Sequence, residues 1–224
     1  NPHVLLESML IASYALNVRN CFVYIRGEFD LPYRRLAGAV EEAYAAGYFG
    51  ERILGTDFSC DIVVYRGAGA YVAGEASGLI SSLEGKKGYP RNRPPRLTVK
   101  GLYQRPTVVN NVESLSNIAW IIAHGAAAFK EVGTPKSPGT RLFSVSGHVN
   151  RPGVYEVELG YPWMKFLDED CGGIKGGRAI KCVVPGGVSS KVLTGAEIAN
   201  LKLAHEDLWD AGSTLGSGGM IVIA

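Results

Sequence analysis

The chain has 224 residues, which is long enough for one large domain or two small ones, each with its own core. Hydrophobic residues make up 46% and charged residues 20%, the proportions of an ordinary soluble globular protein. A net charge of +2, with no run dominated by Lys and Arg, excludes the electrostatic signature of a nucleic-acid-binding protein.

The cysteines and the apolar runs exclude further classes of protein. Cys21, Cys60, Cys171 and Cys182 are widely separated and form no C-x-x-C motif, so the spacing predicts neither a zinc site nor an iron–sulfur site. Buried free thiols in a cytosolic protein fit this spacing better. No apolar run reaches the ~20 residues that cross a bilayer, and the N-terminus lacks the pattern of a signal peptide.

The first half of the chain predicts a strand, a helix and a second strand. Residues 2–16 have the apolar spacing of a helix buried on one face, with Asn1 as its cap. Residues 21–25 (CFVYI) and 61–65 (DIVVY) indicate short buried strands, and residues 31–48 between them indicate an amphipathic helix. This order predicts a βαβ unit with parallel strands and a right-handed crossover.

Residues 66–79 (RGAGAYVAGEASGL) join the second strand to a short helix through a turn at Gly67 and Gly69. Such a junction points backbone N–H groups and a partial positive charge at whatever lies before it, which suits a phosphate or an electron-rich ring. Glu75, near the helix start, adds a hydrogen-bond acceptor. The spacing matches neither G-x-G-x-x-G nor a P-loop, so a plain turn that uses glycine for positive φ is an equal alternative.

Two further segments follow in the first half. Residues 85–99 hold three prolines and five basic residues, so they cannot form regular structure for long. An ordered loop against a ligand and a solvated basic loop are both open, and composition favours the second. Residues 107–123 begin extended and become a helix, with Asn110 or Asn111 at its entrance as a cap.

The second half of the chain has a different pattern. Gly, Pro, Ser and Thr cluster at residues 133–140 in the manner of a linker. Beyond it, the residue pattern predicts a hairpin, a crossing helix and two more strands, at residues 142–149, 154–157, 161–171, 179–184 and 220–224. This order suggests a ubiquitin-like β-grasp domain.

Three motifs in fixed order carry a resemblance to a known family. The chain has RGAGAYVAGEASGL, followed by SLEGKKGYPRNRPP and then by GLYQRPTVVNNVESLSNIAW. With these motifs it closely resembles the flavin-carrying, NADH-oxidising subunit of respiratory complex I. The same module occurs as the diaphorase subunit of NAD-linked hydrogenases and formate dehydrogenases. The likeness runs nearly from one end of the chain to the other.

The resemblance implies a fold, cofactors and partners. It implies an α/β, Rossmann-like flavin domain with a partial parallel sheet over residues 1–134, and a small α+β β-grasp domain of the SLBB (soluble ligand-binding β-grasp) type over residues 140–224. It implies FMN and NADH as cofactors, and electron transfer to iron–sulfur clusters of partner subunits. The same resemblance implies a cytoplasmic place in the peripheral arm of a complex, without membrane insertion.

The resemblance also implies which residues border the cofactors. They are Gly67, Gly69, Tyr71, Gly74, Glu75, Val109, Asn110 and Asn111 at the flavin and nucleotide pocket, with Arg93 and Arg96 as candidates for phosphate contacts. Glu75 and Asn110 are expected to face one flavin cavity. Because hydride transfer between nicotinamide and flavin depends on positioning, no catalytic side chain and no metal ligand are expected.

Two positions depart from the family's motifs. The family usually has C-G-E-E-T-A-L where this chain has residues 73–79, so that Ala76 replaces a second acidic residue. It usually has K-P-P-F where this chain has residues 93–96, so that Arg96 replaces an aromatic residue. A lost carboxylate near the ribose 2′-OH, with a guanidinium nearby, predicts that the site tolerates NADPH or prefers it.

Two segments of the family are not found in the chain. The glycine-rich loop that wraps the FMN phosphate lies upstream of residue 1, and the four-cysteine segment that binds a four-iron cluster lies downstream of residue 224. The sequence therefore predicts the central fragment of a longer subunit, which by itself binds FMN weakly or not at all. A non-catalytic binding or scaffold module that uses the β-grasp domain is the alternative.

Overall fold

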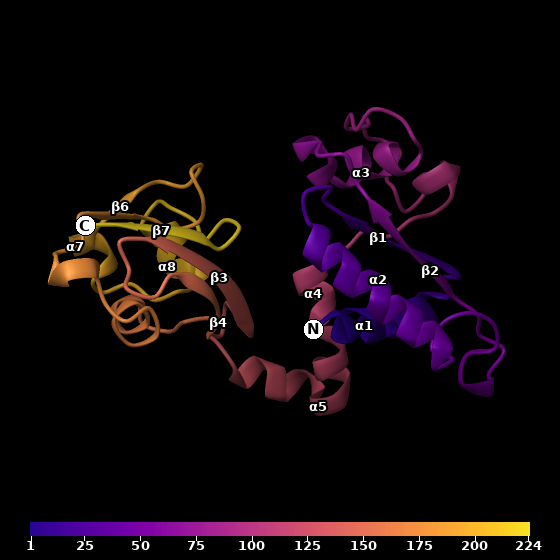
Figure 1. Cartoon of the computed structure of the whole chain (residues 1–224), viewed down its shortest axis with the longest axis horizontal. Coiled ribbons are helices and arrows are strands. Elements are labelled where there is room, and N and C mark those ends of the chain that lie inside the picture. Colours follow the sequence, from indigo (N-terminus) through magenta and orange to yellow (C-terminus); the bar gives the residue numbers. More distant parts are fainter. The chain divides into compact units, whose positions relative to one another are not determined.

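The computed structural model describes every residue from Asn1 to Ala224, and the chain folds into two compact units (Figure 1). The N-terminal unit comprises residues 1–123, and the C-terminal unit comprises residues 124–224. Each unit has a hydrophobic core of its own. No helix has both the length and the apolar character that crossing a membrane requires.

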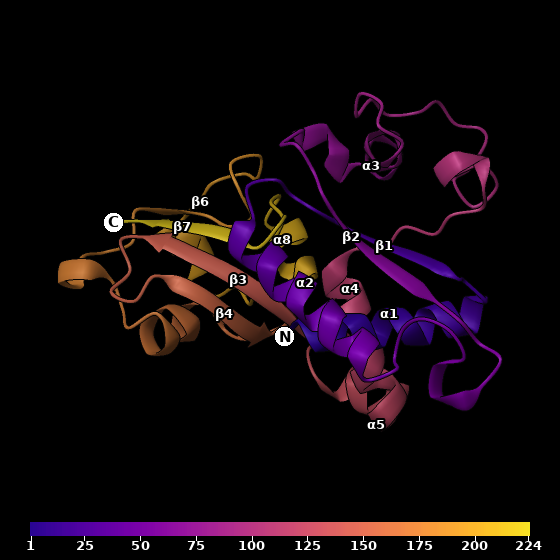
Figure 2. The same cartoon turned by 45° about the vertical axis from the view of Figure 1, so that its right-hand side comes forward.

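The N-terminal unit is built on two parallel strands, β1 (Asn20–Ile25) and β2 (Asp61–Arg66). They lie side by side in Figure 2, and α2 (Asp30–Ala45) connects them. The βαβ order predicted from the sequence is therefore confirmed. The helix between the strands is shorter than predicted, because the chain turns at Gly47, which has a φ of 76°.

The helices α1 (Pro2–Leu16) and α2 share one core with the sheet. The cap predicted for α1 is present, since the Asn1 side chain accepts a hydrogen bond from the N–H of His3. The buried side chains that pack together are Leu5, Leu6, Met9, Cys21, Val23, Leu36, Ala39, Ala43, Phe49, Ile53, Cys60 and Ile62. On β1 and β2 these are alternate residues, so the helices cover one face of the sheet.

The other side of the sheet contacts α3 (Ala76–Leu83). The hydroxyl of Tyr24 lies 3.0 Å from the hydroxyl of Ser82 in α3, and the hydroxyl of Tyr65 donates a hydrogen bond to the Ser82 carbonyl at 3.3 Å.

The predicted helix within residues 107–123 is divided into α4 (Val112–Ser116) and α5 (Ile118–Glu131). The α5 helix is itself broken at Gly125, whose φ of 87° lies outside the helical region.

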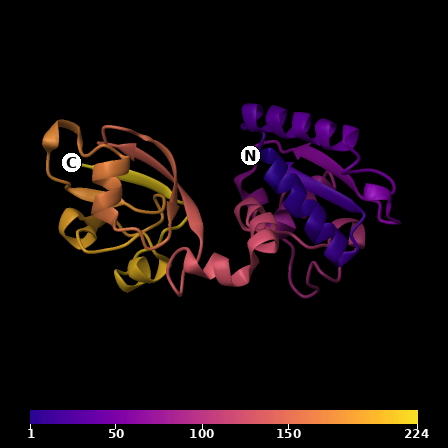
Figure 3. The same cartoon turned by 90° about the horizontal axis from the view of Figure 1, so that it is seen from below.

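The C-terminal unit contains a five-stranded sheet in the order β4-β3-β7-β5-β6. The predicted hairpin is formed by β3 (Thr140–Gly147) and β4 (Gly153–Glu158), and β7 (Gly219–Ile223) lies parallel to β3 (Figure 3). On the other side of β7, β5 (Cys182–Val184) and then β6 (Leu193–Thr194) pair antiparallel. This mixed sheet confirms the predicted α+β fold class of the second half.

Three short helical segments cover the inner face of this sheet. The predicted helix over residues 161–171 is formed by α6 (Trp163–Lys165) and the helical turn Phe166–Asp170 that continues it. Two further helices that the sequence pattern does not indicate are α7 (Gly195–Ile198) and α8 (His205–Asp210). Fully buried members of the core include Phe143, Trp163, Phe166, Leu167, Val183, Ile198, Leu208, Met220 and Val222.

Truncating Phe166 should destabilise the C-terminal unit. Phe166 is fully buried, with its ring centre 6.1 Å from that of Phe143 and 5.5 Å from that of Tyr155. Phe166→Ala leaves a cavity, so the free energy of unfolding should fall by about 3–5 kcal/mol. The control Val188→Ala, at a side chain that is 92% exposed, should change it by less than about 0.5 kcal/mol. Equal losses in urea denaturation would contradict this packing.

Candidate cofactor site

The junction after β2 has the strand, turn and helix predicted from the sequence. A Cβ added to Gly67 would lie 2.5 Å from the hydroxyl oxygen of Tyr24, so a larger residue there would require the Tyr24 side chain to move. Gly69 has a φ of 87°, a conformation that glycine adopts readily. The turn Tyr71–Gly74 follows and leads into α3. Gly67 and Gly69 are therefore explained by close packing and by backbone conformation, as expected if this segment is a plain turn.

Gly74 and Tyr71 are open to an approaching molecule. A Cβ added to Gly74 would meet no atom within 4 Å, and the side chain of Tyr71 is 95% exposed. Gly78 differs, because a Cβ there would lie 2.8 Å from the carbonyl oxygen of Val72 and 3.0 Å from that of Gly88. The junction thus contains one glycine required by packing within α3 and another, Gly74, that leaves the backbone accessible.

The carboxylate of Glu75 is the N-cap of α3. Its Oε2 accepts hydrogen bonds from the N–H groups of Ser77 (2.9 Å) and Gly78 (3.0 Å), and from the Ser77 hydroxyl. Its Oε1 lies 3.0 Å from Nη2 of Arg93. The hydrogen bond from the Ser77 hydroxyl, together with these N–H groups and Arg93, lowers the pKa of Glu75. The positive end of α3 is therefore already matched by a carboxylate of the chain itself.

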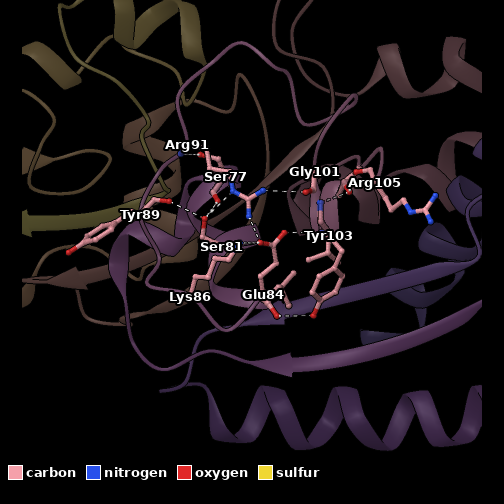
Figure 4. A network of polar contacts seen from close by, with 12 residues as sticks. Ser77, Ser81, Glu84, Lys86, Tyr89, Arg91, Gly101, Tyr103 and Arg105 are labelled. Carbon is pink, nitrogen blue, oxygen red and sulfur yellow. Dashed lines mark hydrogen bonds and ion pairs between the residues drawn. The ribbon is translucent and has the colours of Figure 1, made fainter.

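A polar network anchors the basic loop to α3 (Figure 4). Arg91 is its centre: Nε donates to Oγ of Ser81 at 3.1 Å, and Nη1 donates to the carbonyl of Gly101 at 3.2 Å. Its Nη2 lies 2.9 Å from Oε2 of Glu84 in an ion pair. The backbone N–H of Arg91 donates to Oγ of Ser77 at 2.8 Å. The start of the loop is therefore ordered, and the structure against which it lies is α3.

Glu84 supplies the negative charge of this network. Its side chain is 4% exposed and accepts hydrogen bonds from Nζ of Lys86 and from the N–H of Tyr103, both at 2.8 Å. Burial alone would raise its pKa, but the hydrogen bonds from Lys86 and Tyr103 and the ion pair with Arg91 outweigh burial and lower the pKa of Glu84 to about 2. The buried carboxylate is therefore stabilised by several donors together.

The two neighbouring asparagines have different surroundings. Asn111 caps α4, since its Oδ1 accepts a hydrogen bond from the N–H of Glu113 at 2.8 Å. Asn110 and Val109 instead line a cavity of about 190 Å³ within the N-terminal unit. The other residues that line this cavity are mostly apolar and come chiefly from α1, β1 and α3; they include Leu5, Met9, Val23, Leu79, Ile80 and Leu83.

The structure brings together one group of the predicted site residues and separates the others. The residues at the junction are Gly67, Gly69, Tyr71, Gly74, Glu75 and, through its ion pair, Arg93. Arg96 is exposed further along the loop. Glu75 is not among the residues that line the cavity of Val109 and Asn110. No cluster of three or more His, Cys, Asp or Glu side chains is positioned to hold a metal ion.

The motifs did not single out the residues that fix the loop in place. These are Ser77, Ser81, Glu84 and Arg91, which come from two segments. The sequence did contain one signal for this contact: the acidic Glu84, at the end of a predicted helix, directly precedes a basic, proline-rich loop. Such a signal predicts a charge pair but not which of the five basic residues takes part.

Comparison with known families agrees with this arrangement. Residues 1–120 match the family model described as the Nuo51 FMN-binding domain, and residues 142–192 match that of the SLBB domain. The chain belongs to the Nuo51 FMN-binding domain family. The resemblance and the fold class predicted from the motifs are therefore confirmed.

Relatives and solved structures support membership of this family. The F-type subunit of the NADH-quinone oxidoreductase of Mycobacterium tuberculosis is 47% identical over 216 residues, which are 96% of this chain and 48% of that protein. A second F-type subunit, from Rhizobium meliloti, is 42% identical over 223 residues, which are 100% of this chain and 53% of that protein. The chain thus spans about half the length of the curated relatives it matches.

A solved structure of high similarity is an NAD+-reducing NiFe hydrogenase in its H2-reduced state. Its TM-score with this chain is 0.81 at 34% sequence identity, and the match covers 99% of this chain and 36% of that chain. The air-oxidised state of such a hydrogenase matches with a TM-score of 0.82 over 99% of this chain and 35% of that chain. The fold of this family member is therefore shared with a chain of that hydrogenase.

Gly78→Ala should destabilise the N-terminal unit, whereas Gly74→Ala should not. The new methyl group at position 78 would lie 2.8 and 3.0 Å from two backbone carbonyl oxygens. We expect the free energy of unfolding to fall by about 1–3 kcal/mol, as in other overpacked sites. At position 74 the change should stay within about 0.5 kcal/mol, because no atom lies within 4 Å. Equal changes in urea denaturation would show that Gly78 is not closely packed.

The lowered pKa of Glu84 should make stability depend on pH. Because the folded state favours the carboxylate, its contribution is complete above the ordinary pKa near 4.5 and is lost as the pH falls towards 2. A shift of this size corresponds to about 3 kcal/mol. Between about pH 5 and pH 2, unfolding measurements should show a larger loss for the wild type than for Glu84→Gln. Parallel pH profiles of the two proteins would contradict this role of Glu84.

Proposed function

We propose that this chain is part of an electron-input flavoprotein subunit. In the complete subunit, NAD(P)H would give a hydride to FMN, and electrons would pass to iron–sulfur clusters of partner subunits. The match of residues 1–120 to the Nuo51 FMN-binding domain supports this proposal most directly. The names of the relatives, F-type subunits of NADH-quinone oxidoreductases, point to the same activity.

The residues present fit one part of an FMN site. The cavity beside Asn110 has a volume of about 190 Å³, which is below the ~300–1,000 Å³ of pockets that enclose ligands of this size. A complete flavin pocket would therefore need walls in addition to those of this cavity. This requirement agrees with the share of the curated relatives, about half of their length, that the chain spans.

Within such a site, we assign binding and positioning to five side chains or backbone segments. Gly74 leaves the backbone approachable, and the exposed ring of Tyr71 can pack on a planar group. Glu75 is a fixed acceptor because its carboxylate is held at the start of α3. Val109 and Asn110 would contribute an apolar surface and an amide on the side of the cavity. None of these roles requires a proton to move.

The remaining predicted residues would have supporting roles. Gly67 and Gly69 shape the turn, and Asn111 starts α4. Arg93 would orient Glu75, while Arg96 is exposed and suited to a phosphate contact. In this proposal residues 1–134 form the FMN- and NADH-binding domain, and residues 140–224 form the SLBB domain of a subunit in the cytoplasmic, peripheral arm of a complex.

Flavin binding tests the proposal on the protein expressed with its flanking sequence. After FMN is added and excess removed, absorbance near ~450 nm should remain with the protein. Gly74→Val should weaken FMN binding about tenfold or more, because it fills the open space before the backbone. The matched control is Gly38→Val in α2, where a Cβ also meets no atom within 4 Å. It should bind FMN as the wild type does.

The second candidate function is a non-catalytic binding module. It is favoured by the fact that Glu75 and Asn111 already serve as helix caps within the chain. If the protein with its flanking sequence retains no flavin absorbance after FMN is added, the electron-transfer proposal fails and this second candidate replaces it.

The residues near Glu75 support the acceptance of NADPH as well as NADH. Ala76 adds no second carboxylate next to that of Glu75, and the guanidinium of Arg93 lies 3.0 Å from the Glu75 carboxylate. Ala76→Glu should therefore lower the rate of flavin reduction by NADPH about tenfold relative to NADH, while the uncharged Ala76→Gln should leave the ratio unchanged. Stopped-flow reduction measures both. A wild-type preference for NADH of about a hundredfold would rule this out.

A further inference from the structure

Two cysteine thiols meet in the core of the N-terminal unit. Cys21 is the second residue of β1, Cys60 directly precedes β2, and their sulfur atoms are 3.7 Å apart. Both are free thiols, and both belong to the core under α1 and α2. The hydroxyl of Ser13, on α1, lies 2.9 Å from the Cys21 sulfur. None of the contacts described at the α3 junction involves either cysteine.

The two thiols differ in their access to small molecules. Cys21 and Ser13 line the 190 Å³ cavity that also takes in Asn110. A cavity of this size admits molecules such as water or hydrogen peroxide. Cys60 is 1% exposed and is not among the residues that line the cavity. The pair therefore has an outer thiol at the cavity and an inner thiol behind it.

The surroundings of Cys21 favour its thiolate form. The hydrogen bond from the Cys60 thiol, helped by that from the Ser13 hydroxyl, outweighs burial and lowers the pKa of Cys21 to about 7. The pKa of Cys60 is raised, because its proton is held in the hydrogen bond to Cys21 and because burial disfavours a second thiolate. The thiolate is the form of cysteine that reacts with peroxides.

We propose that Cys21 and Cys60 form a peroxide-reactive pair, with Cys21 as the attacking thiol and Cys60 as the resolving thiol. The sulfur of Cys21 attacks one oxygen of a hydroperoxide, the O–O bond breaks, and the other oxygen leaves as water or an alcohol. Cys21 is then a sulfenic acid. The sulfur of Cys60 displaces its hydroxyl group as water, so that a disulfide forms and one hydroperoxide has oxidised two thiols.

The movement that a disulfide needs can come from Cys60. The two sulfur atoms must move from 3.7 Å apart to about 2.05 Å. Cys60 is not part of the β1–β2 ladder. Its backbone instead pairs with that of Gly50 in an isolated bridge. The approach of the sulfurs therefore does not require the ladder itself to open. The thiol chemistry itself uses no FMN, although Cys21 lines the cavity that Asn110 also lines, so the oxidation is tested without added FMN.

The oxidation of the 224-residue chain by hydrogen peroxide tests this inference. One equivalent should reduce the number of free thiols, counted after denaturation, from four to two, and dithiothreitol should restore all four. The mass should fall by about 2 Da. Peptide mapping without reductant should recover the peptides of Cys21 and Cys60 joined to each other.

Single variants separate the two roles. Cys60→Ser should stop at a sulfenic acid on Cys21 that dimedone captures, and Cys21→Ser should leave Cys60 reduced. The matched control is Cys182→Ser, in the C-terminal unit, which should still join Cys21 to Cys60. Mapping of the wild-type protein decides the question even if a core variant fails to fold. Oxidation confined to Cys171 or Cys182, or unreacted thiols at Cys21 and Cys60, would overturn the inference.

Discussion

The ion pair between Glu84 and Arg91 is the contact on which the arrangement around the candidate site depends. It joins the end of α3 to the loop that follows, and Arg91 extends the contact to Ser81 and Gly101. Removing one partner of such a buried pair leaves the other charge without compensation, which costs more than the pair contributes. The loop carrying Arg93 and Arg96 is therefore held from its first residues, although its tip is exposed.

The residues at the start of α3 meet a structural demand, and under the proposed function the same residues would also bind a ligand. A helix N-terminus attracts an anion, and here the carboxylate of Glu75 occupies that place. A dinucleotide at this junction would therefore meet a neutralised helix end, with binding surface supplied by Gly74, Tyr71 and the arginines. This differs from glycine-rich loops in which the helix end itself receives the phosphate.

The sequence was sufficient for the parts of the fold that local patterns determine. The helix over residues 2–16 and the strands near residues 21–25 and 61–65 match the structure because their caps, apolar spacing and β-branched residues agree. The helices α7 and α8 have four and six residues, too few to show a period. Local patterns therefore located the main elements and missed the short ones.

The candidate site was predictable only in part, because its contacts are tertiary. The glycine turn was evident from residues 66–79, and its two possible purposes could be named. That Asn111 caps α4 while Asn110 lines a cavity depends on a single residue of register. That Arg91, and not a neighbouring basic residue, pairs with Glu84 depends on how the loop returns across α3. Local propensity predicts neither which asparagine caps α4 nor which basic residue pairs with Glu84.

The central strand of the C-terminal sheet is also its last. β7 lies between β3 and β5, and Ser146 of β3 contacts Met220 of β7, 74 positions later. Closing so long a loop is entropically unfavourable and slows folding. During synthesis the β3–β4 hairpin would leave the ribosome early but could not join β5 and β6 until β7 emerged. Until that moment its apolar inner face would be a substrate for chaperones.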